Sequence, residues 1–239
     1  MTLDQTLLAE RLASRPLPYR FYHQVDSTND LAQQWLREGA PSGAVIIADE
    51  QLKGRGRKGR FWHTPPGVAL AISVILRPEP AALHQVTMLG ALAIADLLDE
   101  LGAADVGIKW ANDVLLNGRK VSGVLSEAIW DGDQLIGAVL GRGINVRIDF
   151  TATELAQKAI SIEPALGVPV NRADLLAKLL ARIDYWSDRL GTRALFHDWR
   201  GRLVTPGKHV TITDDHGTVS GIAQGVDDGG ALLVRDDDG

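Results

Sequence analysis

The sequence predicts an α/β protein of the α+β type, with a mixed, largely antiparallel sheet backed by helices and a small β module at the C-terminal end. Residues 44–48 and 68–76 are short apolar stretches with the length and composition of buried strands. Residues 83–101 are apolar nearly all round, as expected of a central helix. Asn117-Gly118 and Asp131-Gly132 are turn signals between extended stretches, which favours antiparallel hairpins.

The N-terminal part predicts a helix, a strand and a second helix. Residues 4–14 have an amphipathic pattern that ends before two prolines, and residues 19–25 have strand character. Five small polar residues, 26–30, then precede a helical pattern that stops at Gly39. The polar group can be a helix cap alone, but a helix N-terminus is also a place where anions and ligands bind.

The middle of the chain predicts three strands that carry polar motifs. We expect one strand at residues 106–116, a return strand at 120–130 and a third strand from residue 134. These hairpins bring the motifs KWANDV, RKVSGVLSE and GRGINV to neighbouring strands or their ends. Each motif alone has a simpler explanation as core, turn or surface, but their convergence on one patch indicates a site.

The C-terminal part predicts two helices and then short strands. Asn171 is a helix cap for a long helix, with Asp174 in the acidic position of a capping box, and residues 194–202 predict a shorter helix. Short strands with Gly and Asp turns begin at Lys208. We expect two domains, 1–203 and 204–239. Because residues 235–239 read as a turn with no strand after it, we expect the natural chain to continue.

Composition excludes several classes of protein. The 239-residue chain is 45% hydrophobic and 23% charged, as in globular proteins with a core. Its net charge of −5 argues against a general nucleic-acid binder, and the absence of cysteine excludes disulfides and a cysteine nucleophile. The longest apolar run, residues 68–76, is far below the ~20 residues of a membrane span. No signal peptide pattern is present, so we expect a cytoplasmic protein without membrane or nucleic-acid partners.

Residues 51–62, QLKGRGRKGRFW, concentrate positive charge in this acidic chain. Glycines allow close approach of backbone N–H groups, and arginines bind carboxylates and phosphates through paired hydrogen bonds. The segment literally matches GxGxxG, but no helix is predicted to follow, as a dinucleotide fingerprint requires. It is not a P-loop either, because no Gly-Lys-Ser/Thr follows. A solvated basic loop or a nucleic-acid patch with Phe61 and Trp62 as stacking residues remains an alternative. We expect a loop that closes over a small anion.

The ordered set of motifs closely resembles biotin–protein ligases. The set comprises Ser-Thr-Asn at 27–29, Gln-x-x-Gly-Arg-Gly-Arg at 51–57, Lys-Trp-x-Asn-Asp at 109–113, Arg-Lys-x-x-Gly-x-x-x-Glu at 119–127 and Gly-x-Gly-Ile-Asn at 141–145. Order and spacing match from about Ser27 to Asn145. The resemblance implies a fold like that of class II aminoacyl-tRNA synthetases and biotin ligases, with an SH3-like C-terminal module. It also implies the activity: biotin and ATP give biotinyl-5′-AMP and pyrophosphate, and biotin then passes to a lysine of a biotin carboxyl carrier domain of acetyl-CoA carboxylase or a related carboxylase.

The same resemblance assigns roles to the residues. It implies that polar side chains at 27–29 and Gln51 surround the biotin head group, and that Lys120 lies near the biotin carboxylate and the α-phosphate. Asp113 is expected to orient or deprotonate the incoming lysine and to help hold Mg²⁺. The expected catalytic residues are Lys120, Asp113, Arg57 and Lys109. The expected substrate-binding residues are Ser27, Thr28, Asn29, Gln51, Gly54, Arg55, Gly56, Arg57, Trp62, Asn112, Lys120, Gly123 and Asn145.

The sequence differs from the family pattern in three ways, and two related enzyme activities are alternatives. Ala111 stands where the family usually has proline, and Arg142 where a small residue is more usual. Only 26 residues precede Ser27, too few for a DNA-binding helix-turn-helix domain, so we expect a ligase without repressor activity. A lipoate–protein ligase is the closest rival, although the doubled Gly-Arg of 54–57 favours biotin. Octanoyl transferases need a cysteine that this chain lacks.

Overall fold

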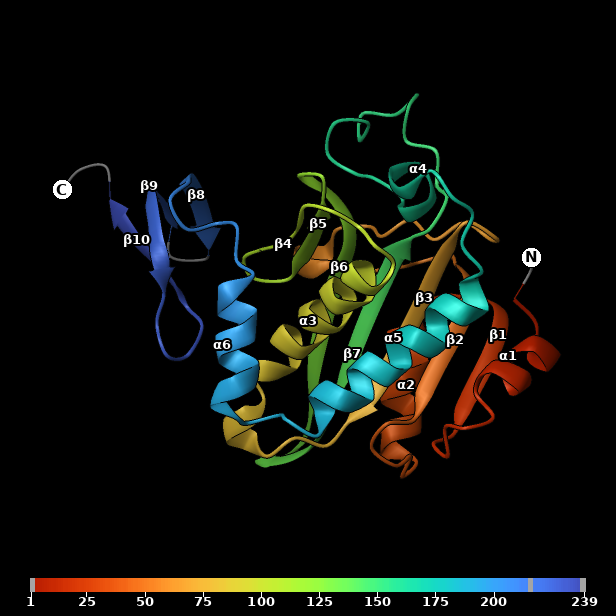
Figure 1. Ribbon diagram of the computed structural model, residues 1–239. Helices are drawn as coiled ribbons and strands as arrows, with labels where there is room; N and C mark the ends of the chain where they lie inside the picture. Colours follow the sequence, from red (N-terminus) through yellow and green to blue (C-terminus); the bar gives the residue numbers. More distant parts are fainter. Residues whose placement is uncertain (1–2, 215–216, 237–239) are drawn as a thin grey trace.

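The computed structural model describes residues 3–214 and 217–236, and its main feature is a seven-stranded sheet (Figure 1). The strand order is β1-β2-β3-β7-β6-β5-β4. Only β1 and β2 pair in parallel, so the predicted mixed, largely antiparallel sheet is confirmed. The strands are β1 Tyr19–Val25, β2 Val45–Gln51, β3 Ala69–Leu76, β4 Val106–Lys109, β5 Asp113–Leu116, β6 Arg119–Asp131 and β7 Gln134–Asn145.

Helices cover the two faces of this sheet unequally. On one face, α1, α3 and α5 bury most of the core, while α6 packs beside α3 (Figure 1). On the other face, Ala32 and Leu36 of α2 pack on Ile46, Ile75 and Val139. The rest of that second face remains open for a site. The helices are α1 Gln5–Arg11, α2 Thr28–Arg37, α3 Gln85–Glu100, α4 Ile162–Leu166, α5 Arg172–Ser187 and α6 Arg193–Gly201, with short 3₁₀ turns at Arg57–Gly59 and Pro80–Ala82.

The predicted single strand over residues 106–116 is wrong. The chain reverses after Lys109, so that β4 and β5 form a hairpin in which Lys109 pairs with Asp113. Trp110 is drawn out of the strand, because its backbone N–H donates to Thr205 Oγ1 at 2.8 Å and its indole N–H donates to the Gly230 carbonyl at 2.9 Å. These partners lie about a hundred residues away in sequence, and local strand propensity does not reveal them.

The C-terminal residues form a separate three-stranded antiparallel sheet at one end of the molecule, far from β1 (Figure 1). Its strands are β8 His209–Asp214, β9 Gly217–Val226 and β10 Leu232–Asp236. The preceding residues also touch the main sheet, since Ile108 exchanges backbone hydrogen bonds with Arg202 and Val204. The division at residue 203 therefore stays a prediction. The turn predicted at 235–239 begins inside β10, and its remainder lies outside the described residues.

Other predicted elements are found with small shifts. The strand at 19–25 has the predicted bounds, the central helix begins two residues after its predicted start, and the long helix begins directly after its predicted cap. Asn171 caps α5 through its side-chain oxygen, but the Asp174 carboxylate pairs with Arg11 of α1. Helix α4 was not predicted, because a five-residue helix carries too little periodicity. Within the described chain, no helix has the length and apolar character needed to cross a membrane.

A buried ion pair joins β2 to α5 on the helix-covered face of the sheet. The Arg172 side chain is fully buried and Asp49 is 8% exposed. Arg172 Nη1 bonds Asp49 Oδ1 and also donates to the Ala69 carbonyl at 3.0 Å, while Asp49 Oδ1 accepts from the Gly67 N–H at 3.2 Å. One guanidinium therefore ties together the end of β2 and the start of β3, between which the cationic loop runs.

Removing one partner of this pair should destabilise the protein strongly. We expect Asp49→Ala to lower the free energy of unfolding by about 3–5 kcal/mol, because it leaves the Arg172 charge buried without a counter-charge. The double variant Asp49→Leu/Arg172→Met should recover most of that loss. Urea denaturation at neutral pH measures both. A single variant as stable as the wild type would contradict this role.

Candidate active site

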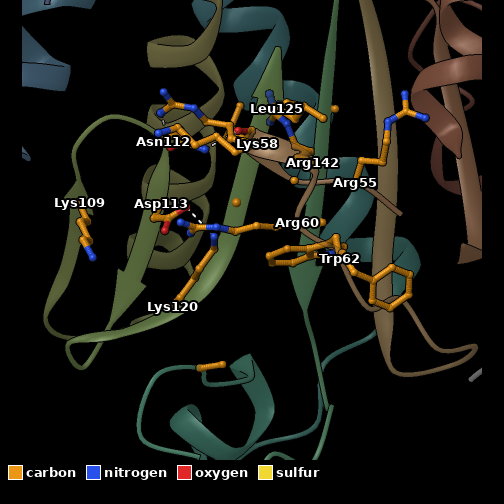
Figure 2. Close-up of a pocket in the computed structure, with 18 of the residues that line it drawn as sticks. Arg55, Lys58, Arg60, Trp62, Lys109, Asn112, Asp113, Lys120, Leu125 and Arg142 are labelled. Atoms are coloured by element: carbon orange, nitrogen blue, oxygen red, sulfur yellow. Dashed lines mark hydrogen bonds and ion pairs between the residues drawn. The ribbon is translucent and has the colours of Figure 1, made fainter. Parts of the chain in front are cut away.

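A cavity of about 650 Å³ opens on the uncovered face of the sheet (Figure 2). This volume is typical of small-molecule sites. Its walls come from the N-terminus of α2, the cationic loop, strands β5–β7, the segment after β7 and strand β8 of the small sheet. All the substrate-binding and catalytic residues expected from the sequence line it except Gly54. The motifs that the sequence separates are thus brought together, while the role of each residue stays a prediction.

The cavity is strongly cationic. Asp113 is the one acidic residue among the described residues that line it. Eight lining residues are basic, although the Arg142 side chain lies on the opposite face of the sheet: Arg55, Arg57, Lys58, Arg60, Lys109, Lys120, Arg142 and Lys158. The whole chain has a net charge of −5, so the positive charge is concentrated at this cavity. Such a concentration favours a ligand with several negative charges.

A buried polar cluster lies where α2 meets the sheet. The N–H and the hydroxyl of Thr28 both donate to Gln51 Oε1, each at 2.9 Å. Ser73 of β3 donates to Asn29 Oδ1 at 2.6 Å and lies 2.8 Å from Thr28 Oγ1. Ser27 is buried but makes no side-chain cap bond to the helix, so capping does not explain it. The cluster offers fixed donors and acceptors to a neutral polar ligand group.

The first half of the cationic loop is held by the residues around the start of α2. Lys53 pairs with Asp26 at 2.7 Å, and Arg55 makes a two-pronged pair with Asp30 at 2.5 and 2.8 Å. The hydrogen bonds to Asp30 raise the pKa of the Arg55 guanidinium. Arg55 lies on the opposite side of the view from Lys109 (Figure 2). Arg55 is engaged by protein carboxylates, so its predicted contact with a ligand requires an additional or exchanged partner.

The second half of the loop crosses the cavity. Arg57 Nη1 donates to Asn112 Oδ1 at 3.1 Å, and Asn112 Nδ2 donates to the Val124 carbonyl at 2.7 Å. Lys58 Nζ donates to the Thr213 carbonyl of β8 at 2.5 Å. The loop therefore forms a roof between the main sheet and the small sheet.

Lys120 and Asp113 form an ion pair inside the cavity. Lys120 Nζ lies 2.6 Å from Asp113 Oδ1, and the two side chains are 33% and 25% exposed. Lys120 Nζ also lies 5.3 Å from the centre of the Trp62 ring. Arg60 extends across the cavity toward the same pair, whereas Lys109 on the edge strand points elsewhere (Figure 2). An anion bound at Lys120 would compete with Asp113 for this ammonium group.

The floor of the cavity is bare backbone. A Cβ on Gly141 would lie 1.9 Å from Asn29 Oδ1, and a Cβ on Gly143 would lie 1.8 Å from Trp62 Nε1. At Gly123 a Cβ would approach Lys120 and the Trp62 ring to 3.1–3.3 Å. Glycine is required at 141 and 143 because side chains from other elements rest directly on the strand.

Arg142, between these glycines, does not obstruct the site. Side chains alternate along β7, so that of Arg142 turns to the opposite face. There Nη2 lies 3.2 Å from the position of a Cβ on Gly90 in α3. Its three guanidinium nitrogens have no hydrogen-bond partner among the described residues, and burial lowers the pKa of Arg142 to about 9. The departure at this position therefore costs stability rather than ligand contacts.

Two expected residues support the site in other ways. Gly54 accepts a backbone hydrogen bond from Trp62 at 2.8 Å, and a Cβ there would strike the Trp62 carbonyl, so this glycine closes the loop on itself. Asn145 Nδ2 donates to the carbonyls of Ile160 and Lys120, at 3.1 and 3.4 Å. It joins the end of β7 to the segment that follows.

Sequence reasoning missed several residues at the site. Ser73 interrupts an otherwise apolar strand on the face of the cavity, and that interruption was an available signal. Lys158, Phe150 and the residues of β8 also line the cavity. Nothing local distinguishes them, because only the tertiary fold brings them there. The described residues contain no group of three or more His, Asp or Glu side chains placed to hold a metal ion.

Comparison with family models gives two matches. Residues 21–145 match the model of the biotin/lipoate A/B protein ligase family. Residues 205–239 match the model of the biotin protein ligase C-terminal domain. The two matched regions correspond to the main sheet with its site and to the small sheet.

Individual relatives align along most of the chain. A bifunctional ligase/repressor BirA from Bacillus subtilis is 33% identical over 91% of this chain and 70% of its own length. A biotin–[acetyl-CoA-carboxylase] ligase from Paracoccus denitrificans is 36% identical over 89% of this chain and 92% of its own. The structure of a biotin protein ligase from Aquifex aeolicus in complex with biotin and ATP superposes with a TM-score of 0.80 at 27% identity, covering 93% of each chain.

Replacing the buried guanidinium should stabilise the fold. We expect Arg142→Met to raise the free energy of unfolding at pH 7 by roughly 1–4 kcal/mol, because an unpaired buried charge is removed. The folded-state pKa of Arg142 is lowered, so the penalty is full below about 9 and is relieved as pH rises through that value. The advantage of the variant should therefore shrink above about pH 9.

Urea denaturation at several pH values measures this difference. Arg37→Met, at an exposed arginine of α2, is the matched control and should show no such pH dependence. A destabilised Arg142→Met would mean that the guanidinium has a stabilising partner.

Proposed function

The chain belongs to the biotin/lipoate A/B protein ligase family, and we propose that it joins biotin to ATP and transfers the biotinyl group to a lysine of a carrier protein. The observation that carries this proposal is one cavity with two unlike ends. One end has the neutral polar cluster around Thr28 and Asn29, and the other has the cations around Lys120. Biotin has a neutral ureido head group and an anionic carboxylate, and ATP adds further negative charge.

The first step forms an anhydride. The biotin carboxylate attacks the α-phosphorus of ATP, an acyl–phosphate bond forms, and the bond to pyrophosphate breaks. Two anions must approach each other, which requires fixed positive charge at the reacting atoms. Lys120 would supply charge at this position, and Arg57, Arg60 and Lys109 add positive charge to the cavity lining. Lys120 would exchange Asp113 for the carboxylate and the α-phosphate.

The second step transfers the acyl group. The neutral ε-amine of the carrier lysine attacks the acyl carbon, and AMP leaves with the bonding electron pair. Asp113, released when Lys120 turns to the anion, is the carboxylate available to orient that amine and accept its proton. Residues 57–62 of the loop cover the cavity, and Lys58 attaches this segment to the small sheet through its bond to the Thr213 carbonyl. This cover keeps water from the anhydride.

Magnesium fits the site as part of the nucleotide. Mg²⁺ usually binds one or two carboxylates together with substrate phosphates. Asp113 is the carboxylate that the described cavity supplies, and the triphosphate would supply the other oxygens. The ion would neutralise charge on the phosphates.

The partners follow from this chemistry. We propose that the acceptor is a biotin carboxyl carrier domain; the name of the Paracoccus denitrificans relative gives acetyl-CoA carboxylase as the acceptor of that protein. We also propose that the reaction takes place in the cytoplasm. The decisive experiment incubates the protein with biotin, ATP, Mg²⁺ and such a carrier domain, and follows the carrier by mass spectrometry. One added biotinyl group on one lysine is expected. Modification by lipoate instead of biotin would establish the rival activity.

Lys120 should be essential for the first step. We expect Lys120→Ala to lower the rate of pyrophosphate release by about 10²–10³-fold, because it removes a charge at the reacting atoms. Lys178→Ala, at a half-exposed lysine of α5 paired with Glu100, is the control and should be unaffected. Pyrophosphate release by Lys120→Ala at the wild-type rate would remove Lys120 from the reaction.

Arg57 should retain the intermediate. We expect Arg57→Ala to raise the dissociation rate of biotinyl-5′-AMP about tenfold, because the roof loses its bond to Asn112 and one cation. A pulse–chase measurement of the bound adenylate tests this. Arg193→Ala, at an exposed position in α6, serves as the control. If both variants retain the adenylate as the wild type does, Arg57 has no part in holding it.

A further inference from the structure

Glu127 of β6 contacts a residue of the polar cluster without lining the cavity itself. Its Oε2 accepts a hydrogen bond from Asn29 Nδ2 at 2.5 Å. Asn29 is buried and lines the cavity, whereas Glu127 is not among the lining residues that the structure describes. Glu127 therefore acts on a ligand only through neighbouring side chains, and Asn29 is the described residue that it contacts at hydrogen-bond distance.

We propose that Glu127 is a positioning residue that sets the orientation of the Asn29 amide and thereby the recognition of the ligand head group. An ionised carboxylate only accepts hydrogen bonds, so the side of Asn29 that faces Glu127 must be the NH₂ group. Asn29 Oδ1 then faces Ser73, whose hydroxyl donates to it at 2.6 Å. The Glu127 carboxylate excludes the flipped amide, because the flip would place Asn29 Oδ1 against another acceptor. The Ser73 hydroxyl does not discriminate, since a hydroxyl can donate or accept and Ser73 Oγ also lies 2.8 Å from Thr28 Oγ1.

The Asn29 amide retains one hydrogen-bond donor and one acceptor for a ligand. One N–H of Asn29 is used by Glu127 and one lone pair of Oδ1 is used by Ser73. The second N–H and the second lone pair remain. This donor and acceptor match a cyclic urea, which presents a carbonyl oxygen next to N–H groups. If the carboxylate were lost, the amide could turn and present the wrong group.

Space for this arrangement comes from β7. A Cβ at Gly141 would lie 1.9 Å from Asn29 Oδ1, so only glycine lets the amide lie flat between β3 and β6. Arg55 stands near the same carboxylate, with Nη2 at 3.7 Å from Glu127 Oε1, but its close pair is Asp30. Asp30 therefore provides a way to separate the two effects.

The inference rests on the proposed function, in which the ligand is biotin. The experiment compares Glu127→Gln with the wild type by calorimetry with biotin and by steady-state pyrophosphate release. We expect the Kd and KM for biotin to rise about tenfold, while kcat at saturating biotin changes less than about twofold. A merely structural effect would lower the active fraction and leave KM unchanged. Glu38→Gln, at the far end of α2, is the matched control.

Asp30→Asn tests the alternative path through Arg55. It removes the close partner of Arg55 and leaves the bond between Glu127 and Asn29 intact. A smaller rise in the Kd for biotin than with Glu127→Gln supports the inference. An equal or larger rise would assign the effect to Arg55 and overturn it.

Two further outcomes are distinguishable. If the wild type binds biotin and Glu127→Gln binds it equally well, the positioning role is refuted while the proposed function stands. If the wild type binds no biotin, the proposed function fails and the inference fails with it. Should Glu127→Gln not fold, hydrogen exchange of the Asn29 side-chain amide in the wild type decides: slow exchange supports the bond, and exchange as fast as in an exposed asparagine contradicts it.

Discussion

The whole site depends on the bare backbone of β7 at Gly141 and Gly143. Asn29 and Trp62 come from a helix and a loop that are far from β7 in sequence, yet both rest where a Cβ of this strand would stand. A single added methyl group at either position would displace one of them. The absence of two side chains is therefore what allows α2, the cationic loop and the sheet to enclose one cavity.

Basic residues line the cavity, whereas most of the nearby acidic residues lie outside its lining. The cavity is lined by cations, with Asp113 as the one acid among the described lining residues. The carboxylates of Asp26, Asp30 and Glu127 lie just behind it and hold the loop and Asn29 in place. A net acidic chain can thus present a strongly positive site, because these three carboxylates lie outside the cavity lining.

Much of this could be predicted from the sequence, because strand and helix periodicity is local. Apolar runs and turn residues located the sheet, and the ordered motifs identified most of the cavity residues. The reversal at Trp110 could not be predicted, since Thr205 and Gly230 cause it. The partners of Arg55 and Asn29 were equally hidden. A motif names a residue but not the side chain it faces, and that pairing is decided by the tertiary fold.

The central claim is that the neutral cluster at Asn29 and the cations at Lys120 together bind biotin and a nucleotide. Titration calorimetry of the wild-type protein tests it most directly, with biotin and with lipoate, each in the presence and absence of ATP and Mg²⁺. The account predicts saturable binding of biotin at one site per chain and formation of a tightly held adenylate when ATP and Mg²⁺ are added. Tight binding of lipoate with no binding of biotin would contradict it.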